Sequence, residues 1–401
     1  MNTFSNAYIP YGGYYSTPFS RWQGSLQNEN PIELGGKTAR NWFLQKKKID
    51  PAILDYCYFG ITMLHKNLFW AHTWSTSLLT DDKKFLPSLM IHQACSTSTT
   101  ILQLAALAID HGSVNTAFGL MSDRASNSAH TVWSNPIGPG GEVLSENWMM
   151  DGFNGDPREG ISMMTTADGV AKDMGITKAE CDAVTARRYE QYLMALENDR
   201  AFQKRYMFPV EVKVSRKQTK LIDQDEGITP TTLEGLAKLK PVNPDGVHSF
   251  GSQTFPADGN CGVIVATRDR AKELSTDPIV EIKIVSYGFA RLKPTYMAAA
   301  PVPASEMALA IAGLKITDMK AIKSHLPFAT NDVNFAKKMG IDVMKMNNYG
   351  TSLIYGHPQA ATGARVIMEM IEETVLLGGG YCLFTGCAAG DMAASIILKI
   401  G

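Results

Sequence analysis

Two cysteines and a histidine occupy positions in this chain where reactive groups are commonly presented. Cys95 ends an apolar stretch and is followed by small polar residues before a helical pattern over 101–109. Cys387 follows a second apolar stretch, at what the pattern indicates is another strand-to-helix turn, and His357 lies in Tyr355-Gly356-His357-Pro358. The first turn of a helix presents unpaired N–H groups and a partial positive charge, which stabilise a thiolate over a thiol. A single free cysteine usually acts as a small buried hydrophobic residue, but two at matching turns favour nucleophilic chemistry.

The elements that must position these groups alternate between strand and helix in the first part of the chain. Helical patterns cover 32–48 and 101–109, and strand patterns cover 55–62, 86–93 and 116–121. Strands separated by helices are typical of a mainly parallel sheet that is covered on both faces.

The character of the sequence changes between about residues 123 and 250. A long helix is predicted over 175–201, with Thr177 as its N-cap and Glu180 three residues later, and a shorter one over 233–239. We interpret this part as an inserted, helix-rich module.

The alternation returns in the last third of the chain. Strands are predicted at 262–267, 279–287, 321–324, 381–385 and 392–398, and helices at 304–312 and 361–377. This repeats the order of the first part, with Cys387 in the place that Cys95 has there. An internally duplicated α/β unit with an insertion is therefore the expected fold class.

Composition restricts the class of protein. The chain has 401 residues, more than one hydrophobic core normally organises, and 45% of them are apolar. The net charge is −1, with Lys and Arg dispersed, which argues against a nucleic-acid partner. The only basic run, Lys46-Lys47-Lys48, ends the predicted helix over 32–48, and we interpret it as a solvated helix end.

The cysteines and the apolar runs also exclude some classes. The six cysteines include no CxxC pair, so no structural zinc site or disulfide framework is expected. No apolar run reaches membrane-spanning length, and the N-terminal residues lack a secretory pattern. We expect a cytoplasmic protein with free thiols, no bound metal and no membrane association.

Several stretches together resemble the thiolase family, and the resemblance extends over nearly the whole chain. In the family, two related α/β halves form a five-layered αβαβα fold with a loop domain inserted in the first half. The resemblance implies an N-terminal half at 1–124 plus 252–273, a loop domain at 125–251 and a C-terminal half at 274–401. The stretches are 18–19, 24–26, the Cys95 turn, 121–122, 126–127, 164–167, 170–171, 232–241, 301–304, 356–358, 363–365 and Cys387.

The resemblance implies an acyltransferase that cleaves a 3-oxoacyl-CoA with CoA, or condenses acyl-CoAs in the reverse direction. Cys95 would be the nucleophile and carry the acyl group, His357 would accept its proton, and Cys387 would act as acid and base. CoA is then a substrate, and no permanently bound cofactor is implied.

The resemblance also implies an oxyanion hole, in which this sequence departs from many family members. Backbone N–H groups of Cys95 and of Ala389, where many members have glycine, would hold the tetrahedral intermediate. His325 stands where many members have asparagine, and with His357 it would stabilise the enolate oxygen. Leu326 and Pro327 replace the family's acidic residue at this point.

Departures in the predicted substrate pocket indicate an unusual acyl group. Thr254 and Phe255 replace the Ser-Gly of the family's pantetheine loop, Gly235 replaces a serine, and a basic residue is missing near 227–230. These changes imply a reshaped CoA tunnel. The candidate acyl-site or CoA-site residues Trp148, Met163 and Met297, together with Phe255 and His325, favour a bulky, branched or aromatic acyl-CoA.

One relative with such a substrate is benzoylsuccinyl-CoA thiolase, which acts with a small zinc-ribbon/OB-fold subunit, so a partner of that kind is a candidate here. The family also implies a homodimer or a dimer of dimers, and the stretch 70–74 is a candidate contact.

Two alternatives remain open. Cys95, His325 and His357 also resemble the Cys-His-His set of ketoacyl-synthase-like condensing enzymes, although these need no second cysteine. A non-catalytic acyl-CoA-binding subunit of a complex is the other, because the usual CoA contacts are missing.

Overall fold

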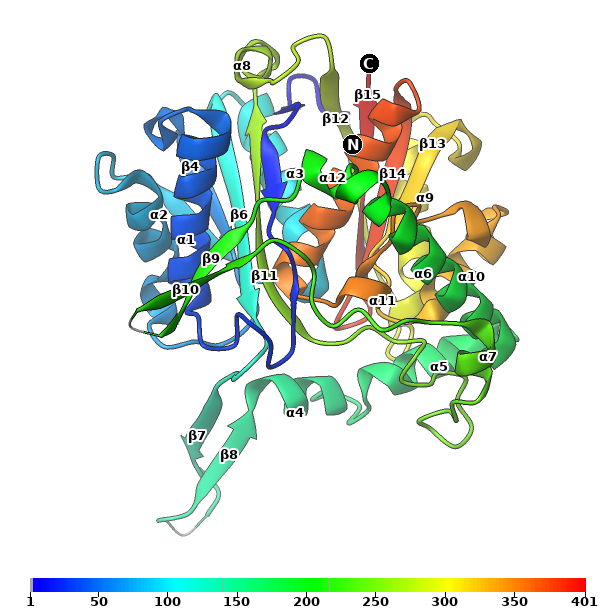
Figure 1. The fold of residues 1–401 in the computed structure, drawn as a ribbon. Coiled ribbons are helices and arrows are strands. Elements are labelled where there is room, and N and C mark those ends of the chain that lie inside the picture. The colour runs from blue at the N-terminus through cyan, green and yellow to red at the C-terminus, as the bar shows by residue number, and fades with distance from the viewer. Residues whose placement is uncertain (1–2, 139, 216) are drawn as a thin grey trace.

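The protein folds into layers of helix and sheet, seen edge-on in Figure 1. This computed structural model describes residues 3–138, 140–215 and 217–401. Helices α1 (Pro31–Asn41) and α2 (Ala71–Thr80) cover one side, and α9 (Pro301–Ala312) and α10 (Ala329–Met339) cover the other. Helices α3 (Thr97–Asp110) and α12 (Gln359–Leu376) lie against each other between the two halves of the sheet. The predicted five-layered αβαβα fold is confirmed.

One continuous pairing path connects the strands of both halves. Its order is β13-β14-β15-β12-β1-β11-β6-β4-β5, and the short strands β2 and β3 also pair with β11. The pairs β4–β5, β4–β6 and β13–β14 are parallel and the others are antiparallel. The expectation of a mainly parallel sheet was therefore wrong, because β11 and β15 return directly beside β6 and β14. The strands are β1 (Tyr8–Pro10), β2 (Tyr14–Ser16), β3 (Ser20–Arg21), β4 (Tyr56–Gly60), β5 (Ser88–Ile91), β6 (Thr116–Arg124), β11 (Ala257–Ala266), β12 (Glu281–Arg291), β13 (Met319–Ser324), β14 (Gly380–Ala388) and β15 (Met392–Ile400).

The topology confirms the internal duplication and corrects one detail of it. The series β4-β6-β11-β1 and β13-β14-β15-β12 share the same order, with a parallel pair followed by two antiparallel pairs. Helix α3 leads into β6 as α12 leads into β14. The position that matches Cys95, at the start of α3, is therefore that of His357 at the start of α12.

Cys387 does not lie at a strand-to-helix turn as predicted. It is in β14, which continues through a turn into the antiparallel β15, so Cys387 pairs with Ala393 across a hairpin. Small residues and glycine after an apolar strand suit a hairpin turn as well as a helix start, and the sequence alone did not distinguish them.

Most predicted element boundaries agree with the structure within a few residues. The predicted helix over 32–48 divides into α1 and a π-helical segment, Trp42–Lys47. Helix α6 (Lys178–Arg200) begins with the predicted capping box of Thr177 and Glu180, and Glu197–Asp199 interrupt its last turns with non-helical backbone. Helix α8 (Arg268–Leu274) was not predicted.

The inserted region contains more strand than expected. It includes two antiparallel ribbons, and the ribbon of β7 and β8 extends away from the layers at the lower edge of Figure 1. Val210–Ser215 alternates apolar and polar residues, which is a strand pattern that our sequence analysis missed. The elements are β7 (His130–Ser134), β8 (Val143–Asn147), α4 (Trp148–Asn154), α5 (Met163–Asp173), α6, β9 (Val210–Ser215), β10 (Gln218–Ile222) and α7 (Leu233–Ala237).

A buried ionic network ties this region to the central layer. Arg365 of α12 donates to both carboxylate oxygens of Asp225, at 2.6 and 2.7 Å, and its Nε lies 3.2 Å from Glu369. The guanidinium carbon also lies 3.7 Å from the ring centre of Tyr355. Because both charges of the Arg365–Asp225 pair are fully buried, losing one partner would leave an uncompensated charge in the core.

Among the described residues, every helix is too short or too polar to cross a lipid bilayer.

Candidate active site

Cys95 lies in a strained turn between β5 and α3. The turn is a single 3₁₀ segment, Ala94–Ser96, and Ala94 has a positive φ of 43°. The Thr97 hydroxyl donates to the Ala94 carbonyl at 2.7 Å and accepts the Gln93 N–H at 2.9 Å. These bonds hold an unfavourable backbone conformation and place Cys95 at the N-terminal end of α3.

His357 lies in the corresponding turn between α11 (Ser352–Tyr355) and α12. Its N–H donates to the Phe255 carbonyl at 2.9 Å, which joins the turn to the chain before β11. Gly356 has φ 86° and ψ 178°, a conformation open essentially to glycine alone. A Cβ at Gly356 would also lie 2.7 Å from Ala257 Cβ and from the Phe255 ring, so only glycine fits there.

The two turns bring His357 and Cys95 into hydrogen-bonding contact. His357 Nε2 lies 3.1 Å from Cys95 Sγ, and its Nδ1 lies 2.7 Å from Thr362 Oγ1. The Thr362 hydroxyl donates its proton to the Pro358 carbonyl at 2.8 Å, so it acts as the acceptor toward His357. Nδ1 therefore carries the imidazole proton, and Nε2 is free to accept the proton of the Cys95 thiol.

His325 follows β13 and stacks on His357. The ring centres are 4.1 Å apart with an interplanar angle of 30°. Ser352 Oγ lies 3.0 Å from His325 Nδ1 and accepts the Leu326 N–H at 3.1 Å. The Ser352 hydroxyl donates its proton to His325 Nδ1, so the imidazole proton of His325 is on Nε2. This Nε2–H has no hydrogen-bond partner among the described residues.

Cys387 is fully buried beside these groups. The side-chain amide of Asn331, in α10, donates to Cys387 Sγ at 3.2 Å. Burial raises the pKa of the Cys387 thiol, and the neighbouring Cys95 raises it further, whereas the Asn331 amide opposes the shift. Cys387 is therefore held as a thiol that can release a proton when its anion is stabilised.

Burial determines the resting protonation of the cluster. It raises the pKa of Cys95 to about 12, although the backbone N–H groups of Cys95 and Ala389 act in the opposite direction by hydrogen bonding. Burial lowers the pKa of His325 to about 3 and, with the neighbouring His325, lowers that of His357 well below its usual value. The helix N-terminus favours a thiolate at Cys95, but desolvation outweighs it, so the Cys95 thiol and the His357 imidazole are both neutral at rest.

The same atoms form a potential metal-ligand set. Cys95, His325 and His357 each offer one ligand atom, and the three atoms lie within 4.8 Å of one another. Sulfur and imidazole nitrogen are the ligands that Zn²⁺ prefers.

Four of the five predicted pocket residues fall into three groups. Met163 and Met297 pack in one apolar cluster with Phe328 and Cys387, so both lie in the surroundings of the Cys387 thiol. Phe255 lines a surface groove of about 420 Å³. Thr254 donates through its hydroxyl to the Ser352 carbonyl at 2.5 Å and through its N–H to the Pro327 carbonyl at 2.7 Å, so it braces the loops behind His325.

Trp148 belongs to a separate cluster around Met63, Ala125 and Phe153. Its indole N–H donates to the Thr62 carbonyl at 3.2 Å. Thr62 in turn donates to Asp123, which also accepts the Ala360 N–H in the first turn of α12. Trp148 is thereby linked to the start of α12 through the backbone and not through the apolar cluster at Cys387.

Four supporting residues were missed from the sequence: Thr362, Ser352, Asn331 and Asp123. Thr362 lies about one turn after Pro358, a spacing that could have indicated its contact with His357. Ser352, Asn331 and Asp123 contact partners that are distant in sequence, His325, Cys387 and Ala360, and no local pattern marks those contacts.

Two family models match this chain. The model of the thiolase N-terminal domain matches residues 13–269, and that of the thiolase C-terminal domain matches residues 279–400. Beta-ketothiolase BktB from Cupriavidus necator is 29% identical over 392 residues, which cover 96% of each chain. The mitochondrial 3-ketoacyl-CoA thiolase of Homo sapiens is 26% identical over 389 residues and also covers 96% of each chain.

Solved structures agree with these matches. The crystal structure of human mitochondrial 3-ketoacyl-CoA thiolase superposes with a TM-score of 0.89 at 25% identity, covering 99% of this chain and 100% of that chain. The acetyl-CoA acetyltransferase of Bacillus anthracis has the same fold, with a TM-score of 0.89 at 23% identity and full coverage of both chains.

Proposed function

The chain belongs to the thiolase family of acyltransferases, and from this premise we propose that it cleaves a 3-oxoacyl-CoA with CoA through an acyl-Cys95 intermediate. The reverse reaction is a Claisen condensation. The observation that carries the proposal is the 3.1 Å contact between Cys95 Sγ and an unprotonated His357 Nε2. That geometry activates a thiol without a resting thiolate.

In the first half-reaction, Cys95 Sγ attacks the 3-keto carbon while its proton moves to His357 Nε2. The resulting alkoxide collapses, the bond between C2 and C3 breaks, and the acyl group stays on Cys95. The electron pair of the broken bond forms the enolate of the departing acyl-CoA, which Cys387 protonates at C2.

In the second half-reaction, the Cys387 thiolate takes the thiol proton of an incoming CoA. The CoA sulfur attacks the thioester carbon, and Cys95 leaves as its thiol after recovering the proton from His357. Cys95 regains its own proton, and the CoA thiol proton replaces the one that Cys387 gave to C2, so both cysteines end as thiols and the cycle needs no permanent cofactor.

Two sets of donors would stabilise the negative charge that develops. The backbone N–H groups of Cys95 and Ala389 already hydrogen-bond the Cys95 sulfur and can hold the tetrahedral oxyanion formed beside it. The buried Nε2–H of His325 has no hydrogen-bond partner among the residues that the structure describes, so it can donate to the enolate oxygen with His357.

The groove of about 420 Å³ lined by Phe255 and Gly235 is our candidate for the pantetheine arm of CoA. The substrate in this proposal is bulky, branched or aromatic, such as benzoylsuccinyl-CoA. The adaptable thioethers of Met163 and Met297 and the ring of Phe328, packed next to Cys387, support it. The proposal includes a cytoplasmic homodimer or dimer of dimers and a small zinc-ribbon/OB-fold partner subunit.

A condensing activity of the ketoacyl-synthase type is the second candidate. The stacking of His325 on His357 beside Cys95 favours it, since a Cys-His-His set suffices for condensation. The two activities differ in their need for Cys387.

Intact-mass spectrometry after mixing with acetyl-, succinyl- and benzoyl-CoA tests the proposal. We expect a mass increment of one acyl group on the native chain and none on Cys95→Ala. An adduct that forms only after a zinc-ribbon subunit is added would support the two-component form. An adduct of equal yield on Cys95→Ala, or none under any condition, would refute acyl transfer through Cys95.

A further inference from the structure

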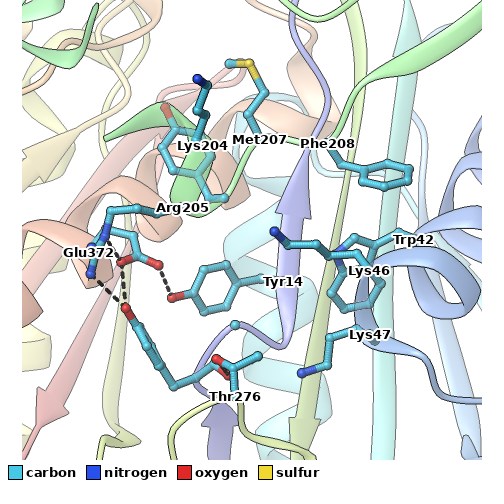
Figure 2. Close-up of a pocket in the computed structure, with 13 residues that line it drawn as sticks. Tyr14, Trp42, Lys46, Lys47, Lys204, Arg205, Met207, Phe208, Thr276 and Glu372 are labelled. Atoms are coloured by element: carbon cyan, nitrogen blue, oxygen red, sulfur yellow. Dashed lines mark hydrogen bonds and ion pairs between the residues drawn. The ribbon is translucent and has the colours of Figure 1, made fainter. Parts of the chain in front are cut away.

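A second cavity lies at the opposite end of α12 from His357. It has a volume of about 280 Å³ and lies among β1, β2, the π-helical segment and the loops before β9 and β12 (Figure 2). Glu372, in the last turns of α12, lies at its wall. At 1.5 Å per residue, Glu372 is roughly 20 Å along the helix from the Cys95 site. The proposed acyl transfer makes no use of this cavity.

The wall of the cavity is strongly cationic. Lys46, Lys47, Lys204 and Arg205 line it together with a single carboxylate, Glu372. Figure 2 shows these charged groups around the same space, with tyrosine rings and Phe208 between them. Cations that line one cavity repel one another and create a positive electrostatic potential in it. A bound anion would reduce this repulsion.

Glu372 does not neutralise the lysines, because other groups occupy its oxygens. Arg205 Nε lies 2.6 Å from Glu372 Oε2, and the hydroxyls of Tyr14 and Tyr11 donate to the carboxylate at 2.6 and 3.1 Å. Arg205 also donates to the Tyr11 hydroxyl at 2.8 Å. The guanidinium fork is thus already bound to a carboxylate, and the lysines carry the remaining charge.

Lys47 is the lysine of the cavity with the weakest charge compensation. Its Nζ donates to the neutral Leu274 carbonyl at 2.7 Å, and within the described part of the chain no carboxylate lies within 4.0 Å of Lys46 or Lys47. Burial lowers the pKa of Lys47 to about 8. Lys204 has only a surface partner, Asp199, at 2.5 Å. The prediction that the run at 46–48 is a solvated helix end was therefore wrong for Lys47.

We propose that this cavity binds the phosphate group of a small phosphorylated ligand or inorganic phosphate itself. Lysine ammonium groups bind phosphate as point charges, whereas a carboxylate ligand would prefer the arginine fork that Glu372 already occupies. The volume lies at the lower limit of ligand pockets, which suits a small anion better than a whole cofactor.

Titration calorimetry and thermal unfolding of the full chain, without CoA, test the site. The probes are inorganic phosphate, pyrophosphate and AMP, against potassium chloride at equal ionic strength. We expect saturable binding and a rise in Tm, with Lys47→Met and the exposed Lys46→Met each weakening affinity about tenfold or more. Lys48→Met is the matched control, because Lys48 belongs to the same run but does not line the cavity.

The pH dependence adds an independent readout. Just below pH 8 the phosphate is largely a dianion and Lys47 is charged, so binding is strongest there; as the pH rises through about 8, Lys47 loses its charge and affinity falls. Tighter binding of AMP than of phosphate would identify a nucleotide as the source of the phosphate, and equal binding would identify the free anion. Binding that survives both Lys46→Met and Lys47→Met, or no binding beyond the chloride control, would overturn the proposal.

Discussion

Cys95 and Cys387 have different neighbours, and we expect different roles from them. His357 Nε2 contacts the Cys95 sulfur, whereas the Asn331 amide contacts that of Cys387. An imidazole can remove a proton, but an amide can only stabilise an anion once it forms. The surroundings therefore favour Cys95 as nucleophile and Cys387 as the group that exchanges a proton with substrate.

Replacing each cysteine by alanine should separate these roles. Cys95→Ala should abolish the acyl-enzyme, because the attacking atom is gone. Cys387→Ala should still acylate from a thioester donor but should lower kcat for thiolysis by about 10²- to 10⁴-fold, the usual contribution of general acid–base catalysis. Intact-mass and steady-state measurements on both variants check this prediction.

The buried Cys261 provides the control, since it lies in β11 away from the cluster and its replacement by alanine should leave acylation intact. Equal loss of acylation in Cys95→Ala and Cys387→Ala would contradict the division of roles.

The pH profile of acylation should be flat near neutrality. The pKa of Cys95 is raised to about 12 and that of His357 is lowered well below its usual range, so the thiol–imidazole pair stays neutral across neutral pH. Activity should fall only at acid pH, when His357 becomes protonated and can no longer accept the thiol proton. Single-turnover acylation between pH 5 and 10 measures this. A rise centred near the ordinary thiol pKa of about 8.5 would show that a free thiolate attacks instead.

At the scale of elements, the site depends on two helices that begin at the same place. The first turn of α3 follows Cys95 and that of α12 follows His357, and Gly363 lets the helices approach, because a Cβ there would lie 3.2 Å from Ser98 Cβ. The Ser98 hydroxyl also donates to the Ala360 carbonyl. Duplication of one α/β unit has thus placed Cys95, the proposed nucleophile, and His357, its proposed base, at equivalent helix ends.

Gly356→Ala should misplace His357 and destabilise the fold. The added Cβ would lie 2.7 Å from Ala257 and from the Phe255 ring, and the backbone conformation would be strained by about 1–3 kcal/mol. We expect loss of acylation together with a lower free energy of unfolding, measured by intact mass and denaturant titration.

Gly313→Ala is the matched control for that variant. Gly313 also has a positive φ, 66°, but a Cβ there would meet no atom within 4 Å. Gly313→Ala should lower the free energy of unfolding by about 1 kcal/mol, through backbone strain alone, and should leave acylation unchanged. A Gly356→Ala protein that acylates at the native rate would show that the turn does not position His357.

At the scale of the whole molecule, β5 ends the sheet with an open edge. It pairs only with β4 in the described structure. Leu89 within β5 is exposed, Phe85 shortly before β5 is 88% exposed, and Phe69 and Trp70 before α2 are also exposed. An exposed apolar edge strand is a template for pairing with another chain. We propose that a second copy covers this edge, next to the Cys95 turn that follows β5.

Leu89→Lys should convert the protein to a monomer, since it would bury a charge at this edge. Light scattering coupled to gel filtration measures the mass, with the equally apolar and 83% exposed Ile279 as the control position. Ile279→Lys should leave the assembly intact. A monomeric native chain, or a dimer unchanged by Leu89→Lys, would contradict the prediction.

Local patterns in the sequence determined the fold class and singled out Cys95, His357 and Cys387 as the predicted reactive residues. Apolar periodicity, helix caps such as Thr177 with Glu180, and the motifs around Cys95, His357 and Cys387 depend on neighbours a few residues apart. They identified the elements, the duplication and the insertion, because these features are encoded by local preferences.

The tertiary structure decided what depends on contacts between distant segments. The antiparallel returns of β11 and β15, the hairpin at Cys387, and the contacts of Thr362, Ser352 and Asn331 follow from how the layers pack. Packing also determined the protonation of the site, since burial raises the pKa of Cys95 although a helix N-terminus favours its thiolate. Desolvation depends on every element that surrounds a group, and a linear sequence does not specify those neighbours.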